Sequence, residues 1–218
     1  MAEPGLPAGG RAQWLVIMAK EPRAGAVKTR LARDIGTVAA TGFYRHSLTS
    51  LAARLAGNPR WRTIVAVAPD VARLNTVWPA GVARLAQGPG DLGMRMQRVF
   101  DSLPPGPAII IGADIPHVRA GHIAEAFSRL RSNEAVFGPA ADGGYWLVGL
   151  RRSPKTRAIF ANVRWSSAHA LKDTLANLDG CSVAMAGELE DVDDGKSHRR
   201  LKRAGGRIVL PLSRLKAP

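Results

Sequence analysis

The chain lacks several features that would place it in a definite class of protein. Its 218 residues include one cysteine, Cys181, so no internal disulfide can form, which fits a reducing compartment. No apolar run approaches the roughly 18 residues of a membrane-spanning helix. The start of the chain has no basic segment followed by an apolar one, so it does not look like a signal peptide. We therefore expect a cytoplasmic protein with a flexible leader over residues 1–13.

Acidic and aromatic residues are also scarce. The 17 Asp and Glu residues face 31 Lys and Arg residues, for a net charge of +14, and aromatics make up 6% of the chain. A charge of this sign favours polyanionic partners. Nucleic-acid binders usually combine it with a recognition motif or interleaved aromatics, and neither is visible here. We expect small phosphate-bearing ligands rather than nucleic acid, while the oligomeric state stays open.

Short apolar runs alternate with segments of helical character. The pattern predicts helices over 35–56, with a possible break at Gly36, and over 91–103, 122–130, 168–178 and 197–204. It predicts strands over 14–19, 63–68, 82–85, 107–112, 135–137, 145–149 and 182–186. Strands that are apolar on both faces and alternate with helices are typical of an α/β fold. We predict a Rossmann-like three-layer sandwich with a mostly parallel central sheet, in one domain over 14–218.

The loop after the first strand, MAKEPRAGAVKTRL over 18–31, combines glycine, proline and several cations. Backbone N–H groups and basic side chains in such a loop can surround phosphates. Lys28 and Arg30 are the candidate catalytic residues, since they would neutralise charge on a triphosphate and its transition state. An ordinary solvated turn explains the loop about equally well, and the spacing is not that of a Walker A loop. The candidate nucleotide-binding residues are Ala19, Lys20, Gly25 and Lys28.

A second loop, QGPGDLGMRM over 87–96, follows the third predicted strand. Its glycines permit close approach of the backbone to a ligand, so Gly90 and Asp91 join the nucleotide-binding candidates. Asp91 also stands where a helix cap is expected. The two interpretations are compatible.

Carboxylates follow the strongest strand and the last one. Asp114, in IIIGADIP, would be costly to desolvate unless it were paired or bound to metal. Mg²⁺ prefers one or two carboxylates together with phosphate oxygens, which suits a nucleotide site. The acidic cluster at 188–194 offers Asp191 or Asp193 to complete the metal site.

The segment GPAADGGYW over 138–146 lies between two apolar runs. A hairpin turn explains it, but paired glycines followed by aromatics also suit the floor of a substrate pocket. Asp142, Gly143, Gly144 and Tyr145 are therefore the candidate substrate-binding residues. Another short motif, Trp165-Ser-Ser167, indicates a helix cap before Ala168.

Taken in order, AKEPRAGAVKTRL, QGPGDLGMRM, IIIGADIP, FGPAADGGYWLVGL, RWSS and DVDD resemble a bacterial nucleotidyltransferase-like family with the glycosyltransferase A (GT-A) fold. The resemblance spans about residues 14–200, with a more distant similarity to 2-phospholactate and molybdenum cofactor guanylyltransferases. It implies a nucleoside triphosphate or nucleotide-sugar, and Mg²⁺ or Mn²⁺ as cofactor. It also implies that Lys28 and Arg30 contact phosphates and that Asp114 and Asp193 bind the metal.

Three functions follow as hypotheses. The first is metal-dependent transfer of a nucleoside monophosphate from a nucleoside triphosphate to a small phosphorylated acceptor, with release of pyrophosphate. The second is glycosyl transfer from a nucleotide-sugar to a sugar or phosphorylated acceptor on the same fold. The third is a nucleotide-binding module without turnover.

Overall fold

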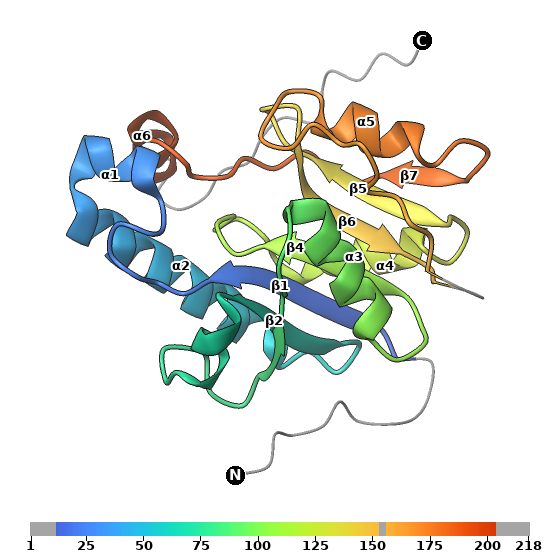
Figure 1. Cartoon of the computed structure of the whole chain (residues 1–218), viewed down its shortest axis with the longest axis horizontal. Coiled ribbons are helices and arrows are strands. Elements are labelled where there is room, and N and C mark those ends of the chain that lie inside the picture. The colour runs from blue at the N-terminus through green and yellow to red at the C-terminus, as the bar shows by residue number, and fades with distance from the viewer. Residues whose placement is uncertain (1–11, 153–155, 204–218) are drawn as a thin grey trace.

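One sheet organises the part of the chain that the computed structural model describes, residues 12–152 and 156–203. Its seven strands are β1 (Trp14–Lys20), β2 (Arg62–Ala68), β3 (Ala83–Ala86), β4 (Ala108–Gly112), β5 (Ala135–Pro139), β6 (Tyr145–Leu150) and β7 (Val183–Met185). They lie in the order β3-β2-β1-β4-β6-β5-β7, and only β6 runs against its neighbours (Figure 1). The predicted mostly parallel sheet is confirmed.

The helices complete the alternation that the sequence predicted. They are α1 (Thr29–Ile35), α2 (Thr37–Ala56), α3 (Leu92–Ser102), α4 (Ala120–Arg129), α5 (Ala170–Ala176) and α6 (Gly195–Arg203), with a 3-10 helix η1 (Asp70–Leu74). Helices α2 and α4 pack on one face of the sheet through residues such as Leu48, Leu51 and Phe127. Helix α3 packs on the other face through Val99 and Phe100, and α5 adjoins that same core.

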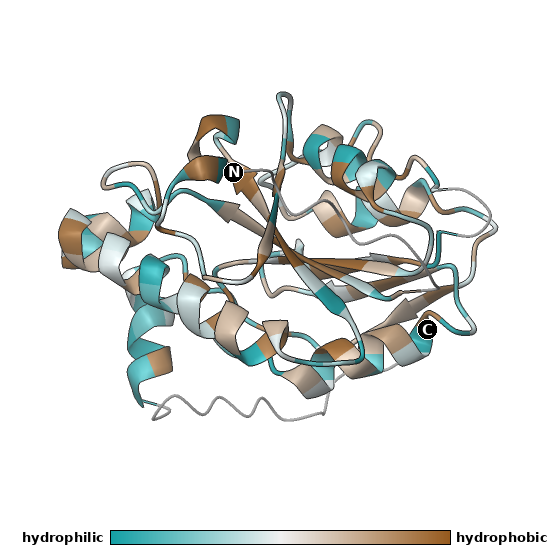
Figure 2. Cartoon of the chain, turned by 90° about the horizontal axis from the view of Figure 1, so that it is seen from below, coloured by the Kyte–Doolittle hydropathy of each residue, from teal (hydrophilic) through white to brown (hydrophobic). Residues whose placement is uncertain are grey.

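Figure 2 shows the result as hydrophobic strands between two helical layers, the three-layer arrangement that was expected. The central strands β1 and β4 are buried on both faces, as their continuous apolar runs require. None of the described helices combines the length and the apolar character needed to cross a membrane.

Two details differ from the predicted elements. The helix expected over 35–56 is α2, which begins at Thr37 because the chain breaks at Gly36, as the sequence allowed; the φ of Gly36, +88°, favours glycine. Helix α1 was not predicted, since Thr29–Ile35 follows the basic loop and is too short to show a clear periodicity. The leader over 1–13 and the end of the helix expected over 197–204 fall largely or partly outside the described residues.

Candidate active site

Lys28 lies where the loop after β1 enters α1. It adopts a left-handed backbone with φ +48°, which is uncommon for a residue other than glycine. Its side chain is 4% exposed, and Nζ donates a 2.8 Å hydrogen bond to Oδ2 of Asp114. The same Nζ lies 3.5 Å from Oδ1 of Asp193. A buried charge on an unfavourable backbone, facing two carboxylates, is the kind of strained feature that clusters at functional sites.

The topology of the sheet brings these residues together. Strands β1 and β4 pair in parallel, so the loops that follow them meet at one edge, and Asp114 stands two residues beyond β4. The chain after β7 then runs along the same edge, where Leu189 N donates to Pro139 O at 3.3 Å and Val192 N donates to Asp114 O at 3.3 Å. Because of this path, Asp193 lies near the end of β4.

Arg30, in the first turn of α1, completes a group of four that we call the Lys28 cluster: Lys28, Arg30, Asp114 and Asp193. Its Nη1 lies 3.0 Å from Oδ2 of Asp193, while its side chain is 71% exposed. Burial acts to lower the pKa of Lys28, but the charge and hydrogen bond of Asp114 outweigh it, so the pKa is raised. The lysine is therefore fully charged at neutral pH.

Asp191 lies beside this cluster and behaves differently. Burial, followed by repulsion from Asp114, raises its pKa to about 6, although Lys28 partly offsets the effect. A carboxyl with such a pKa is poorly compensated by cations in the ligand-free protein. The site thus has more negative charge than its own lysine and arginine can neutralise.

The donor set suits a divalent metal ion, although Lys28 occupies the space between the carboxylates here. Among residues 12–152 and 156–203, no group of three or more His, Cys, Asp or Glu side chains converges as a ready-made metal site. Mg²⁺ and Mn²⁺ sites that act on nucleotides need fewer protein ligands, because phosphate oxygens and water complete them. Asp114 and Asp193 fit that requirement.

At the same edge of the sheet, by the ends of β1 and β2, lies a cavity of about 560 Å³, here called the basic hollow. Its charged lining residues are Lys20, Glu21, Arg23, Asp70 and Arg95, and Gly88 and Pro89 supply backbone. The hollow is therefore built from the ends of β1 and β2, the loop after β3 and the first turns of α3. Three cations around an open cavity suit a ligand with several phosphates.

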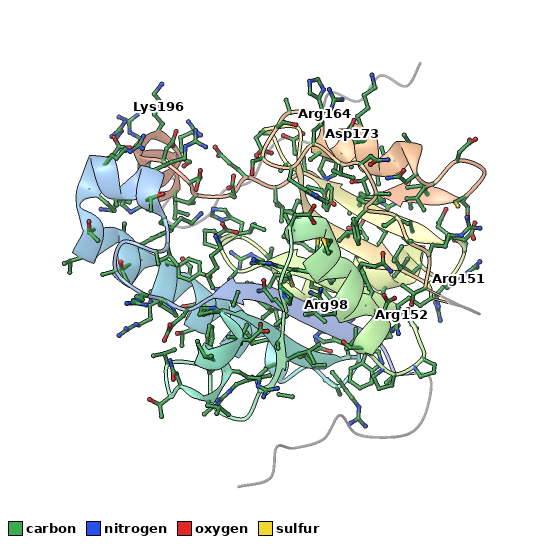
Figure 3. The ribbon with its side chains drawn as sticks, in the orientation of Figure 1. Arg98, Arg151, Arg152, Arg164, Asp173 and Lys196 are labelled. Carbon is green, nitrogen blue, oxygen red and sulfur yellow. The ribbon has the colours of Figure 1, made fainter. Side chains whose placement is uncertain are left out.

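The loop over 87–90 is held over α3 by Arg98. This side chain donates to the carbonyl oxygens of Gln87 at 2.7 Å and Pro89 at 2.9 Å, and Figure 3 shows it on α3. A Cβ at Gly88 would lie 2.4 Å from the guanidinium of Arg98, and the φ of Gly88 is +74°. The left-handed backbone favours glycine there, and a side chain would also displace the guanidinium of Arg98.

Arg30, Asp114 and Asp193 of the Lys28 cluster line a second cavity of about 550 Å³, here called the acidic cavity. Arg30 is the one cation among its lining residues in the described part of the chain. Aromatic rings of Tyr145, Trp146 and Trp165 also line it. Its carboxylates are those of Asp114, Asp142, Asp191 and Asp193.

Most of the residues singled out from the sequence lie at these cavities. Lys20 lines the basic hollow, while Asp142, Gly144 and Tyr145 line the acidic cavity. Their ligand-binding roles stay predictions. The predicted hairpin is confirmed, since β5 and β6 pair antiparallel around residues 140–144.

Other predicted residues support the cavities without lining them. Ala19 is buried, and its carbonyl oxygen accepts from Gln87 Nε2 at 3.1 Å. Asp91 caps α3 by accepting from Met94 N at 2.8 Å, as predicted. The remaining predicted residues absent from the lining are Gly25, Lys28, Gly90 and Gly143.

Sequence reasoning missed part of both cavities. Arg95 lies in the glycine-rich motif over 87–96 but was not singled out within it, and Asp70 stood in a loop with no signal for a ligand. The helix expected from Ala168 begins later, at Ala170, with His169 as an N-cap that makes no side-chain bond, while Ser167 Oγ accepts from His169 N at 3.2 Å in the turn before it. Trp165 and Ser166 line the acidic cavity.

With this geometry in place, comparison with known proteins identifies the family. The family described as "Uncharacterized protein conserved in bacteria (DUF2064)" matches residues 51–167, more than half of the chain. The chain belongs to this family. No curated protein matches the DUF2064 chain.

Solved structures match the DUF2064 chain over most of its length. A candidate nucleotide-diphospho-sugar transferase from Desulfovibrio desulfuricans G20 superposes with a TM-score of 0.80 at 26% identity, covering 88% of this chain and 87% of that one. A 4-diphosphocytidyl-2C-methyl-D-erythritol synthase from Anaerococcus prevotii gives 0.56 at 9% identity, covering 91% and 100%. These matches establish the fold of nucleotide-diphospho-sugar transferases, which is the GT-A type that the sequence predicted.

A third match shows the ligands that one protein of this fold binds. Glucosyl-3-phosphoglycerate synthase from Mycobacterium tuberculosis, solved with Mn²⁺, UDP-glucose and phosphoglyceric acid, gives a TM-score of 0.55 at 10% identity, covering 90% of this chain and 80% of that one. The structural neighbours thus include both nucleotidyl- and glycosyltransferases.

Proposed function

We propose that the protein is a metal-dependent nucleotidyltransferase. A phosphate oxygen of a small acceptor attacks the α-phosphorus of a bound nucleoside triphosphate, the bond between the α-phosphorus and the bridging oxygen breaks, and pyrophosphate leaves. The observation that carries the proposal is the Lys28 cluster, in which Nζ of Lys28 lies 2.8 Å from Asp114 and 3.5 Å from Asp193. Arg30, Asp114 and Asp193 of this cluster line the acidic cavity, and the basic hollow lies at the same edge of the sheet, so that a donor and an acceptor can meet there.

The basic residues at the site have two different roles in the proposed reaction. Lys20, Arg23 and Arg95 in the basic hollow bind the phosphates of the donor. Lys28 and Arg30 lie beside the carboxylates that would hold the metal and the transferred phosphate. Their positive charges would therefore offset the negative charge that develops on this phosphate. Because a phosphate acceptor is already anionic, no side chain is needed to remove a proton from it.

Asp114 and Asp193 would hold Mg²⁺ or Mn²⁺, which supplies neutralisation of phosphate oxygens when it is bound. The Mn²⁺ of the glucosyl-3-phosphoglycerate synthase structure supports a divalent metal on this fold. As donor we place GTP first for testing, in view of the distant likeness to two guanylyltransferases. The setting that we propose is the cytoplasm.

Glycosyl transfer from a nucleotide-sugar is the second candidate. The carboxylates and aromatic rings of the acidic cavity favour it, because they suit a sugar next to the phosphates. Pyrophosphate distinguishes the two reactions, since glycosyl transfer releases none. A nucleotide-binding module without turnover would bind the donor and release nothing.

A thermal-shift panel of nucleoside triphosphates and nucleotide-sugars, each with and without Mn²⁺, tests the proposal. A ligand at 100 times its dissociation constant adds about 2.7 kcal/mol to the free energy of unfolding. We expect a metal-dependent shift that Asp114→Ala abolishes and that the exposed control Asp179→Ala retains. For the nucleotide that gives the largest shift, pyrophosphate release is then measured in the presence of sugar phosphates. Absence of any nucleotide-dependent shift would reject the proposed function.

A further inference from the structure

The segment over 163–168 forms one wall of the acidic cavity, and Trp165 is fixed within it. Its ring contacts Tyr145 edge-on at 6.5 Å between centroids and lies 6.0 Å from the ring of Phe160. A Cβ at Gly93 would lie 2.6 Å from Trp165 Cζ2, so the ring sits directly against the backbone of α3. The indole is thus held as a rigid apolar surface at the cavity.

Ser166 follows in an unfavourable backbone conformation. Its φ is +57°, in the left-handed region. Unlike glycine, serine has a Cβ, which makes this conformation unfavourable. The side chain is exposed and lines the acidic cavity. Within residues 12–152 and 156–203 its hydroxyl makes no hydrogen bond, so it is available to a ligand as both donor and acceptor.

An ion pair behind these residues holds them in place. The carboxylate of Asp173 on α5 accepts from Arg164 N at 3.0 Å, from Nε at 2.9 Å and from Nη2 at 2.8 Å. Figure 3 shows the two side chains together at α5. Ser167 Oγ also donates to Arg164 O at 2.6 Å. Three contacts to one carboxylate fix the backbone immediately before Trp165.

Asp142 presents a carboxylate to the same cavity. Its Oδ1 accepts from Gly144 N at 2.9 Å, which fixes the side chain, while Oδ2 has no hydrogen-bond partner in the described ranges. The turn that carries it is joined to the opposite wall, because Leu171 N donates to Gly143 O at 3.1 Å. Asp142 and Ser166 thus lie on two segments that pack together.

We propose that Asp142, Trp165 and Ser166 form a subsite for the polyhydroxylated, sugar-like part of the second substrate. The proposal rests on the proposed function and names the chemistry of that substrate. A hydroxyl group both donates and accepts hydrogen bonds, so it can pair with an acceptor-only carboxylate and with a serine hydroxyl. The apolar C–H face of a sugar ring packs against an indole, in the same way as other apolar surfaces do.

Two other chemistries fit the subsite less well. A phosphate accepts but does not donate, and it would face the charge of Asp142 and Asp191 with Arg30 as the nearest lining cation. An ammonium group can donate to Asp142 and to the hydroxyl oxygen of Ser166, but it offers no acceptor for the hydroxyl proton, whereas a sugar hydroxyl satisfies both. The phosphate of a sugar phosphate can instead lie at the Lys28 cluster while its sugar lies in the subsite.

The same sugar chemistry has two possible sources: a sugar phosphate that accepts the nucleotide, or the sugar of a nucleotide-sugar. Calorimetric titration of the Mn²⁺-loaded protein separates them. One arm adds hexose and pentose 1-phosphates after saturation with a non-hydrolysable nucleoside triphosphate, with inorganic phosphate and choline phosphate as comparison ligands. The other arm compares UDP-glucose and GDP-mannose with UDP and GDP alone.

We expect at least one sugar ligand to bind better than its sugar-free comparison. Trp165→Ala and Asp142→Asn should each weaken that binding about tenfold, the effect of losing one good contact of about 1.4 kcal/mol. Ser166→Gly should weaken it as well, although glycine relieves the left-handed backbone. The matched control is Asn162→Gly, which relieves a φ of +56° in the same segment and should leave binding unchanged.

The binding of the nucleoside triphosphate itself, measured in every variant, distinguishes a failure of the subsite from a failure of the proposed function. Retained nucleotide binding with lost sugar binding supports the subsite. Retained nucleotide binding with no preference for sugar ligands, or with unchanged sugar binding in Ser166→Gly and Trp165→Ala, overturns the subsite and leaves the proposed function standing. A wild-type protein that binds no nucleotide overturns both.

Discussion

The basic hollow and the acidic cavity have opposite character, although they lie at the same edge of one sheet. The basic hollow is bordered by Lys20, Arg23 and Arg95, whereas the acidic cavity has carboxylates and three aromatic rings. A net charge of +14 therefore describes the protein as a whole but not its second cavity. The contrast teaches that a strongly basic protein can carry a cavity lined mainly by carboxylates beside one with three cations.

The contrast follows from the topology of the sheet. The basic hollow lies at the ends of β1, β2 and β3, which are parallel, and takes its residues from the loops after them. The acidic cavity takes residues from the antiparallel β6, which begins at this edge with Tyr145, and from the chain after β7. The reversed strand thus brings aromatic side chains to an edge that otherwise carries loops.

The largest effect is expected at Lys28, whose Nζ contacts two of the carboxylates that line the acidic cavity. Lys28→Met should reduce the rate of transfer about 10²–10³-fold, the usual cost of removing a group that stabilises charge in a transition state. The same change should tighten Mn²⁺ binding to the nucleotide-free protein, because Nζ no longer competes for Asp114 and Asp193. Steady-state kinetics and Mn²⁺ titration by electron paramagnetic resonance measure the two effects.

Opposite directions for metal binding and transfer are the critical outcome of that experiment. Arg129→Gln, which removes an exposed ion pair with Glu125 on α4, is the control and should change neither quantity. Weaker Mn²⁺ binding in Lys28→Met would contradict the idea that lysine and metal share the two carboxylates.

A smaller effect, on stability, is expected where the turn of Asp142 packs against the wall of Trp165. Gly143 has φ +84°, and a Cβ there would lie 2.4 Å from the carbonyl oxygen of Ala168. Gly143→Ala should lower the free energy of unfolding by about 2–3 kcal/mol, from left-handed strain and a backbone clash. Chemical denaturation measures it. Gly25→Ala, at φ +76° with open space around it, should lose only about 1 kcal/mol.

If the two glycine variants lose equal stability, the turn and the wall are not tightly packed, and the acidic cavity is less rigid than described.

The contact between Gly143 and Ala168 could not be predicted from the sequence. Paired glycines at 143 and 144 predicted a turn between two strands, and the hairpin is there. The close approach to Ala168, however, depends on where the segment before α5 lies, which no local pattern encodes.

The fold and the Lys28 cluster were more accessible from the sequence than the cavity walls. Strands such as 107–112 were evident as continuous apolar runs, and carboxyl ends of parallel strands share an edge, so Lys28 and Asp114 could be expected to meet. Asp193 was named only as one of two candidates and through the family resemblance. Its position depends on the path of the chain after β7.

The walls were missed because their residues carry ordinary local signals. Trp165 and Ser166 stand in a motif that also fits a helix cap, and Arg95 stands in an amphipathic helix. Helix α1 was not predicted because it is one short segment after a basic loop. In each case, tertiary packing gives the residue its role.

A further prediction sharpens the difference in ligand preference between the cavities. Arg95→Gln should weaken binding of a nucleoside triphosphate about three- to tenfold, since one charge-assisted contact is lost from the basic hollow. Binding of the sugar ligand should not change. Asp142→Asn should show the reverse pattern, and calorimetry on both variants gives the comparison. Equal losses for both ligands in either variant would mean that the cavities do not act separately.

The smallest effect concerns the charge that the acidic cavity holds without a ligand. The pKa of Asp191 rises from 3.8 to about 6, chiefly through burial, so the folded protein holds a proton there that the unfolded chain has lost. Stability should therefore fall as the pH rises from about 4 to about 6 and then level off, since the folded state binds more protons in this range. Asp191→Asn should flatten this decline, matching the wild type near pH 4 and exceeding it above pH 6. Melting temperatures in EDTA across this range test it, with Asp179→Asn as the control; parallel curves for Asp191→Asn and wild type would show that the acidic cavity carries no uncompensated charge at Asp191.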